Sequence, residues 1–200
     1  MDRHRWDERY GADELLWGAE PNRTLVAEVA GLVPGKALDL GAGEGRNAVW
    51  LAERGWDVTA VDFAAAAVAK GEQMAAARGV RVSFMVADLL EYDPAPGGFD
   101  LTVVLYLHLP PAQRGRVLEA AARSLAPGGV ALVLGHHVAN LMHGHGGPQD
   151  ASVLLDPEEV AAELPGLAVV TAGRVDRTVT TEDGPTVAID ALVRAERRVP

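Results

Sequence analysis

The sequence predicts an α/β fold, a doubly wound, mainly parallel sheet of seven strands whose last two form an antiparallel hairpin. Two observations predict it. Strand-like apolar segments and helix-like segments alternate five times, an order typical of parallel strands joined by helical crossovers. The segment TTEDGP at residues 180–185 is a turn signal between the last two strand-like segments. With 200 residues and no dividing linker, the chain is expected to form one domain.

Each expected element follows from its pattern of apolar residues. Residues 1–22 form an arm in which Trp6, Tyr10 and Trp17 stand among charges, and the arm is interpreted either as a lid or as a segment pinned to the body by aromatic burial. Helical spacing and turn glycines predict helices over residues 24–33, 46–54, 63–79, 112–125 and 156–164. Apolar or alternating runs predict strands over residues 37–40, 56–62, 80–88, 99–109, 130–137, 167–179 and 186–198.

Composition restricts the classes of function. Acidic residues outnumber basic ones 28 to 18, and the formal net charge of −10 disfavours a nucleic-acid partner because the chain repels phosphates. The sequence has no cysteine, so disulfides and thiolate metal sites are excluded. The charged start MDRHRWDERY lacks a signal-peptide core, and no apolar run is long enough for a membrane span. We therefore expect a cytoplasmic protein with no membrane partner.

A glycine-rich turn, GAGEGR at residues 41–46, joins the first expected strand to its helix. Ligands of doubly wound sheets bind beside such turns, where free N–H groups and missing side chains allow close approach. The dinucleotide pattern G-x-G-x-x-G would need a glycine in place of Arg46. Glu44 would also repel a diphosphate, by about 4 kcal/mol at a separation of about 4 Å before screening. Both residues favour a nucleoside ligand without phosphate over NAD.

Two aspartates end the next two expected strands. Asp62 lies 19 residues after Gly43, about the spacing at which an acid reaches a ribose diol in this fold class. Asp88 precedes Leu89, a pair that suits the amino group and the ring face of an adenine, and Phe63 would supply the opposite apolar wall. Capping of the next helix is the alternative role for each aspartate taken alone. The ordered set of a glycine turn and two aspartates favours adenosine binding.

These segments resemble the class I S-adenosylmethionine (SAM)-dependent methyltransferases, which have a Rossmann-like doubly wound fold. LDLGAGEGRN resembles the family's first motif, D-x-G-x-G-x-G, and VDF and VADLL resemble its second and third. FDLTVVLYLHL resembles the fourth strand and LAPGGVALVL the turn and fifth strand, so the resemblance covers nearly the whole chain. More narrowly, EGRNAVWLAERGWDVTAVDF looks like the tellurite-resistance and thiopurine-type branch of small-molecule enzymes. That branch often begins its second helix with a Ser-Pro capping pair, which FAAAA replaces here.

The resemblance implies that the chain is an enzyme that transfers a methyl group from SAM to a small-molecule acceptor by in-line displacement. It also implies cofactor contacts along the carboxyl edge of the sheet. The methionine part would be surrounded by Asp39, Gly41, Gly43 and Gly45, and the ribose would be held by Asp62 with Phe63 beside it. The adenine would contact Ala87, Asp88 and Leu89, and the sulfonium would lie over Leu105. The amino-acid end would be closed off by Trp17 and Arg46.

The acceptor side of the site is expected just past the fourth strand, at Tyr106 and His108. His108 is a candidate general base for an oxygen or nitrogen nucleophile, whereas a thiol or an anionic chalcogen would need little help. A surface or capping histidine is the alternative. Four further histidines stand in HHVANLMHGHGG, whose glycines predict a mobile loop over the substrate, with a surface loop without function as the alternative. Their spacing fits no regular zinc pattern, so no metal is expected.

Two other functions stay open at this stage. An NAD-type oxidoreductase shares the fold class, although Glu44 and Arg46 disfavour it. A SAM-sensing or partner-binding module would keep the fold without turnover. Binding of SAM but not NAD would distinguish a methyltransferase from the oxidoreductase. Release of S-adenosylhomocysteine would distinguish it from the sensor module.

Overall fold

The computed structural model describes residues 3–11, 14–182 and 184–199. Its seven strands form one sheet in the order β3-β2-β1-β4-β5-β7-β6. Neighbouring strands are parallel except at β5–β7 and β7–β6, which are antiparallel. The expected mainly parallel sheet with a terminal hairpin is therefore confirmed. The strands are β1 (Lys36–Leu40), β2 (Asp57–Asp62), β3 (Ser83–Val86), β4 (Phe99–Leu105), β5 (Leu125–His136), β6 (Ala168–Thr181) and β7 (Gly184–Glu196).

Helices separate β1 from β2, β2 from β3 and β4 from β5, but β3 passes to β4 through a segment without a helix, so the expected alternation is interrupted there. Side chains cap the first turns of two of the helices: Asn22 caps α2, and Asp156 caps α7 ahead of a proline. The helices are α1 (Arg3–Tyr10), α2 (Arg23–Val29), α3 (Arg46–Glu53), α4 (Ala65–Ala77), α5 (Pro111–Ser124), α6 (Asn140–His143) and α7 (Pro157–Ala162), with a 3₁₀ turn, η1 (Ala151–Val153).

Strand β3 is shorter than the strand expected over residues 80–88. It is an edge strand that pairs only with residues 59–62 of β2. The residues on either side of β3 therefore make no strand-to-strand hydrogen bonds that would extend it. Strand β5 is longer than expected because Leu125 already pairs with Phe99. Met1, Asp2, Ala12 and Asp13 of the expected arm, Asp183 of the expected turn and the terminal Pro200 lie outside the described residues.

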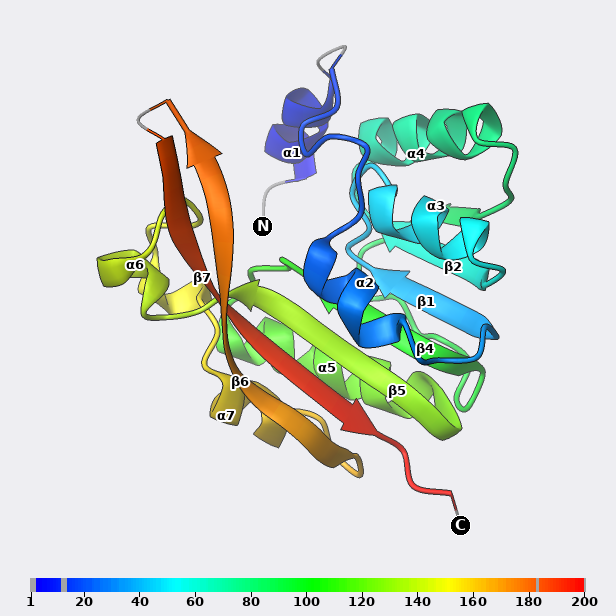
Figure 1. Ribbon diagram of the computed structural model, residues 1–200. Helices are drawn as coiled ribbons and strands as arrows, with labels where there is room; N and C mark the ends of the chain where they lie inside the picture. Colours follow the sequence, from blue (N-terminus) through cyan, green and yellow to red (C-terminus); the bar gives the residue numbers. More distant parts are fainter. Residues whose placement is uncertain (1–2, 12–13, 183, 200) are drawn as a thin grey trace.

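Helices cover both faces of the sheet, and each face has its own apolar core. On one face α2 and α3 bury side chains such as Leu25 and Leu51 against β1, β4 and β5. On the other face α5 and α7 bury Leu118 and Val160. Figure 1 shows α2 and α3 in front of the sheet and α5 behind it. Within residues 3–11, 14–182 and 184–199, no helix is long and apolar enough to traverse a lipid bilayer.

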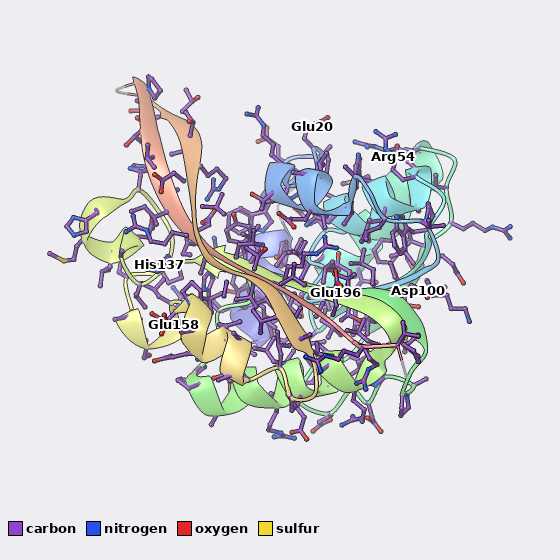
Figure 2. The ribbon with its side chains drawn as sticks, turned by 60° about the horizontal axis from the view of Figure 1, so that its bottom comes forward. Glu20, Arg54, Asp100, His137, Glu158 and Glu196 are labelled. Atoms are coloured by element: carbon purple, nitrogen blue, oxygen red, sulfur yellow. The ribbon has the colours of Figure 1, made fainter. Side chains whose placement is uncertain are left out.

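The parallel strands place all their carboxyl ends at one edge of the sheet. Asp100, near the start of β4, and His137, just past the end of β5, lie on opposite sides of the molecule (Figure 2). The turns after β1 to β5 therefore meet at the same edge as His137, which is where doubly wound folds bind ligands.

The N-terminal arm supplies a cap that the sequence of α4 lacks. Ala64, the N-cap residue of α4, has no side chain that could accept a hydrogen bond. The Oδ1 atom of Asp7 in α1 instead accepts the N–H of Ala66 at 3.2 Å. Tyr10 of the same helix packs with Ala64 and Ala67. The arm is thus tied to the helix that follows β2 (Figure 1).

Candidate functional site

The glycine turn between β1 and α3 is a tight loop whose backbone only glycine adopts readily. Gly41, Gly43 and Gly45 have φ values of +82°, +55° and +76°, in the left-handed region that favours glycine. The N–H groups of Gly41 and Ala42 both donate to the carbonyl oxygen of Val61, at 2.9 and 3.1 Å. These bonds hold the loop against the end of β2, so the two turns share one surface.

Asp39, in β1 just before the loop, is a buried carboxylate that lacks a partner. It is 1% exposed, and no group among the described residues bonds to its Oδ2 atom. Burial raises the pKa of Asp39 to about 7, and nearby Asp62 raises it further, while the charge of Arg46 opposes both. A buried acceptor without a donor calls for a ligand or water that donates to it. A ligand with an ammonium group fits this position.

Asp62, the last residue of β2, is oriented by two backbone groups. Its Oδ2 accepts the N–H of Gly43 at 2.8 Å and its Oδ1 accepts the N–H of Ala64 at 2.9 Å. The side chain is 6% exposed, and burial raises its pKa although these two bonds oppose the rise. Each carboxylate oxygen has a second lone pair, so Asp62 can still accept from a diol.

The remaining residues of the expected cofactor set lie at the same edge. Asp88 is half-buried two residues past β3 and accepts the N–H of Leu90 at 2.9 Å, a local turn close to the capping role considered as its alternative. The N–H of Ala87 donates to the main-chain oxygen of Asp62, so only its carbonyl is free for a ligand. Leu105 is buried at the end of β4. Phe63 packs beside Tyr10, whereas Leu89 packs against the α5 face.

Trp17 and Arg46 lie together, and Arg46 is engaged by the main chain of the arm. The Nη1 of Arg46 donates to the carbonyl oxygens of Trp17 and Glu20, at 2.8 and 3.4 Å. The indole N–H of Trp17 donates to the Tyr10 hydroxyl at 3.4 Å, and the ring is half exposed. A Cβ at Gly43 would lie 3.0 Å from that hydroxyl, so Tyr10 stands directly over the loop.

Glu44 does not act on the loop as the sequence suggested. Its carboxylate is buried and pairs with Lys70 at 3.1 Å, and it accepts the N–H of Leu16 at 2.9 Å. The charge that was expected to repel a diphosphate is therefore largely balanced. Glu44 ties the arm to the loop and to α4, and the case against a dinucleotide depends on Arg46 instead.

Tyr106 and His108 follow β4 and lie beside each other, with ring centroids 6.4 Å apart. Tyr106 has a φ of +56°, and its hydroxyl donates to the Oδ2 of Asp190 at 2.6 Å. Burial, with the negative charge of Asp190, raises its pKa, so the phenol stays protonated. The Nδ1 of His108 lies 3.1 Å from the carbonyl oxygen of Val153, and its Nε2 is buried without a partner.

Sequence reasoning missed Arg177 and Asp190, which complete this cluster. Asp190 is fully buried in β7, and the Nε of Arg177 in β6 donates to its Oδ2 at 2.7 Å. The ring of His136 lies 5.4 Å from that of His108 in a stacked arrangement, and its Nδ1 is 3.4 Å from the Oδ1 of Asp190. One signal was available: Asp190 is the only charged residue in the apolar run VAIDALV.

The loop after β5 is held closely in this structure. Asn140 accepts the N–H of Ile189 at 2.7 Å and donates to the carbonyl oxygen of Gly146 at 2.9 Å. A Cβ at Gly147 would lie 2.6 Å from the His136 ring, so the loop covers that imidazole. His143 and His145 are exposed. No three histidine or acidic side chains of the described residues gather as a metal site would require.

Comparison with known proteins connects this edge of the sheet to methyl transfer. Residues 37–129 match the family model described as a methyltransferase domain, and this segment runs from β1 through the turn after β4 into β5. Demethylmenaquinone methyltransferase of Thermus thermophilus is 35% identical over 127 residues, which are 62% of this chain and 56% of that protein. The chain spans between about a third and somewhat more than half of the length of the curated relatives it matches first.

Solved structures share the whole fold. The N-methyltransferase NodS from Bradyrhizobium japonicum, in complex with S-adenosylhomocysteine, has a TM-score of 0.74 at 20% identity over 98% of this chain and 99% of its own. A second structure comes from work on the conversion of a disulfide bond into a thioacetal group during echinomycin biosynthesis. It has a TM-score of 0.79 at 23% identity, over 98% of this chain and 91% of its own. The chain thus shares the α/β fold of these two structures.

Proposed function

We propose that this chain is a SAM-dependent methyltransferase that acts on a small-molecule acceptor. One observation carries the proposal: Asp39 is buried beside the glycine loop with no partner for its Oδ2 among the described residues, inside the segment that matches the methyltransferase family model. A cationic amino-acid group bound there would relieve the cost of burying this charge. NAD brings a diphosphate to such a loop, and Arg46 occupies the position where its pattern needs glycine.

The residues at the carboxyl edge fit SAM in the order the sequence predicted. Asp39 and the loop glycines would hold its methionine part, Asp62 its ribose and Asp88 its adenine. Phe63, Leu89 and Leu105 would supply apolar contacts, while Ala87 has only its carbonyl to offer. When bound, SAM supplies a methyl group activated by a sulfonium, so the protein mainly has to position the acceptor and exclude water.

Trp17 and Arg46 would act through the arm in this proposal. Arg46 holds the arm by its carbonyl oxygens, and Tyr10 covers the loop, which supports a role for the arm as a lid over the methionine part. The acceptor would arrive on the other side, at Tyr106 and His108, with His108 as its general base. The tellurite-resistance and thiopurine-type branch, suggested by the sequence motifs, is one source of small acceptors of this kind.

Calorimetric titration tests the cofactor half of the proposal. The chain is expected to bind SAM and S-adenosylhomocysteine but not NAD. Asp62→Asn should weaken SAM binding by about 10- to 100-fold, because hydrogen bonds to a charged group contribute about 1.5–3 kcal/mol. Asp57→Asn, at the exposed start of the same strand, is the matched control and should bind SAM normally. Binding of NAD without SAM would reject the proposal.

A product assay tests the transfer itself. Acceptors of different chemistry are incubated with SAM, and S-adenosylhomocysteine is quantified. Its release with at least one acceptor supports an enzyme. SAM binding with no release from any acceptor would favour a sensor module over a methyltransferase.

A further inference from the structure

The cluster beyond Tyr106 has a chemical character that is not needed for binding SAM. Its members come from four strands or strand ends: Tyr106 and His108 after β4, His136 at the end of β5, Arg177 in β6 and Asp190 in β7. Arg177 packs over the Tyr106 ring at 5.5 Å, and the pKa of Arg46 is lowered mainly by burial and further by the positive charge of Arg177. The cluster therefore borders the glycine loop on its acceptor side.

The charges of this cluster cancel. Arg177 donates to both oxygens of Asp190, at 2.7 and 3.4 Å, and Asp190 is fully buried. Burial lowers the pKa of His108 to about 4 and lowers that of His136, so both imidazoles are neutral near pH 7. Within the described cluster, the one permanent cation is thus already paired with the one carboxylate. An anionic acceptor would therefore find no free cation within this cluster, and burying its charge there would be costly.

The cluster also has an excess of hydrogen-bond acceptors. The Nδ1 of His108 faces a carbonyl oxygen, so this nitrogen carries the ring proton and the Nε2 carries a lone pair. That Nε2 is buried and has no partner among the described residues, whereas the Nδ1 of His136 faces the Oδ1 of Asp190 at 3.4 Å. Both oxygens of Asp190 already accept hydrogen bonds. The unmet need at this position is therefore for a donor.

Two glycines make room for the imidazole pair. A Cβ at Gly135 would lie 3.3 Å from the Cε1 of His108, and one at Gly147 would lie 2.6 Å from the Cδ2 of His136. Any side chain at position 147 would displace His136 or the loop. The pair is thus seated between β5 and the loop after it, and movement of that loop would admit an acceptor.

We infer that the acceptor is an uncharged molecule whose nucleophile is an O–H or N–H group, and that this group donates its hydrogen to the Nε2 of His108 beside the His136 ring. This inference rests on the proposed function. The acceptor oxygen or nitrogen forms a bond to the methyl carbon while the carbon–sulfur bond breaks. The electron pair of the carbon–sulfur bond stays on the sulfur, which becomes a neutral thioether. The proton of the acceptor passes to the Nε2, and the imidazolium then releases it to solvent.

A weakly basic imidazole suffices for this step. The donor atom becomes strongly acidic as it gains the methyl group, so the proton moves to His108 late in the transfer. Tellurite, iodide and thiolates need no such base, because they are anionic before the reaction and lose no proton. The arrangement therefore separates protic acceptors from anionic ones.

Two measurements on the full chain test the inference. SAM binding is first established by calorimetry, so that failure of the proposed function is recognised separately. A matched panel of catechol, phenol, aniline, thiophenol, iodide and tellurite is then assayed for S-adenosylhomocysteine. Methylation of a hydroxyl or amino member is expected, and His108→Phe should reduce its rate by about 100- to 10,000-fold while SAM affinity stays within about threefold. His143→Phe, exposed in the neighbouring loop, is the control and should leave the rate unchanged.

Turnover of thiophenol, iodide or tellurite at a rate that His108→Phe does not alter would overturn the inference. The second measurement does not depend on the choice of acceptors. A long-range ¹H–¹⁵N correlation spectrum near pH 7 should show His108 with a proton on Nδ1 and none on Nε2. A protonated ring, or the opposite tautomer, would refute the inference even if the panel contains no substrate.

Discussion

Asp39 shows how one residue can couple folding to pH. Burial raises its pKa to about 7, whereas a carboxyl of this kind in an unfolded chain titrates near pH 3.9. Between these values the folded state holds a proton that the unfolded state has lost, so the free energy of unfolding falls as the pH rises. The stabilisation that the bound proton of Asp39 gives the folded state is fully present below about pH 4 and is lost by about pH 7. The free energy of unfolding falls by about 4 kcal/mol over this range.

Asp39→Asn should remove this dependence. The variant and the unaltered chain are compared without ligand at each pH. The free energy of unfolding of the variant should rise relative to that of the unaltered chain by about 3–4 kcal/mol between pH 4 and pH 8. Urea unfolding at several pH values measures it. Asp57→Asn, an exposed aspartate at the start of β2, is the control. A difference that does not change with pH would show that Asp39 is ionised throughout.

At the scale of single elements, two glycines within helices should respond in opposite ways to alanine. Gly71 in α4 faces Phe84, and a Cβ there would lie 2.5 Å from the ring and 3.3 Å from the carbonyl oxygen of Glu44. Gly115 in α5 has no atom within 4 Å of such a Cβ. Gly71→Ala should lower the free energy of unfolding by about 1–3 kcal/mol through overpacking. Gly115→Ala should raise it by up to about 1 kcal/mol, since alanine favours helix. Chemical denaturation tests both, and equal effects would contradict the packing argument.

The attachment of the arm can be tested through Glu44. Glu44→Ala removes the acceptor of the Leu16 N–H and the partner of Lys70, so the arm should loosen from the loop. We expect faster amide exchange over residues 14–18 and a loss of about 1–3 kcal/mol in the free energy of unfolding. Hydrogen-exchange mass spectrometry measures the first effect. Glu72→Ala, exposed on α4, should change neither, and unaltered exchange in Glu44→Ala would mean that the arm is held elsewhere.

For the whole molecule, ligand binding should appear as thermal stabilisation. SAM at about 100 times its dissociation constant should add about 2.7 kcal/mol to the free energy of unfolding. For a protein of this size that corresponds to a rise in Tm of about 5–10 °C. NAD at the same concentration should leave the Tm unchanged. Scanning calorimetry gives both values, and stabilisation by NAD alone would point to a dinucleotide enzyme.

The sequence was sufficient for the sheet, and it placed the proposed cofactor residues at one edge of that sheet, because those features are local patterns. Alternating segments, the glycine turn and the acids at Asp62 and Asp88 can each be recognised within a few residues. The acceptor side could not be assembled in this way. The Tyr106–Asp190 hydrogen bond joins residues 84 apart, and the cap from Asp7 to Ala66 joins residues 59 apart. Such pairs depend on the tertiary path of the chain, which no periodicity records.

The position of Phe84 has a consequence for engineering the loop. A Cβ at Gly45 would lie 2.7 Å from the Phe84 ring, and the same ring closes on Gly71, whereas Gly43 faces only the hydroxyl of Tyr10. Directed evolution that randomises the loop toward an altered nucleoside would therefore return glycine at position 45 under every selection. Position 43 should also retain glycine, because its φ of +55° strains other residues even where a shorter side chain at position 10 makes space. An invariant glycine in such a library would record the shape of a neighbouring strand rather than the identity of the ligand.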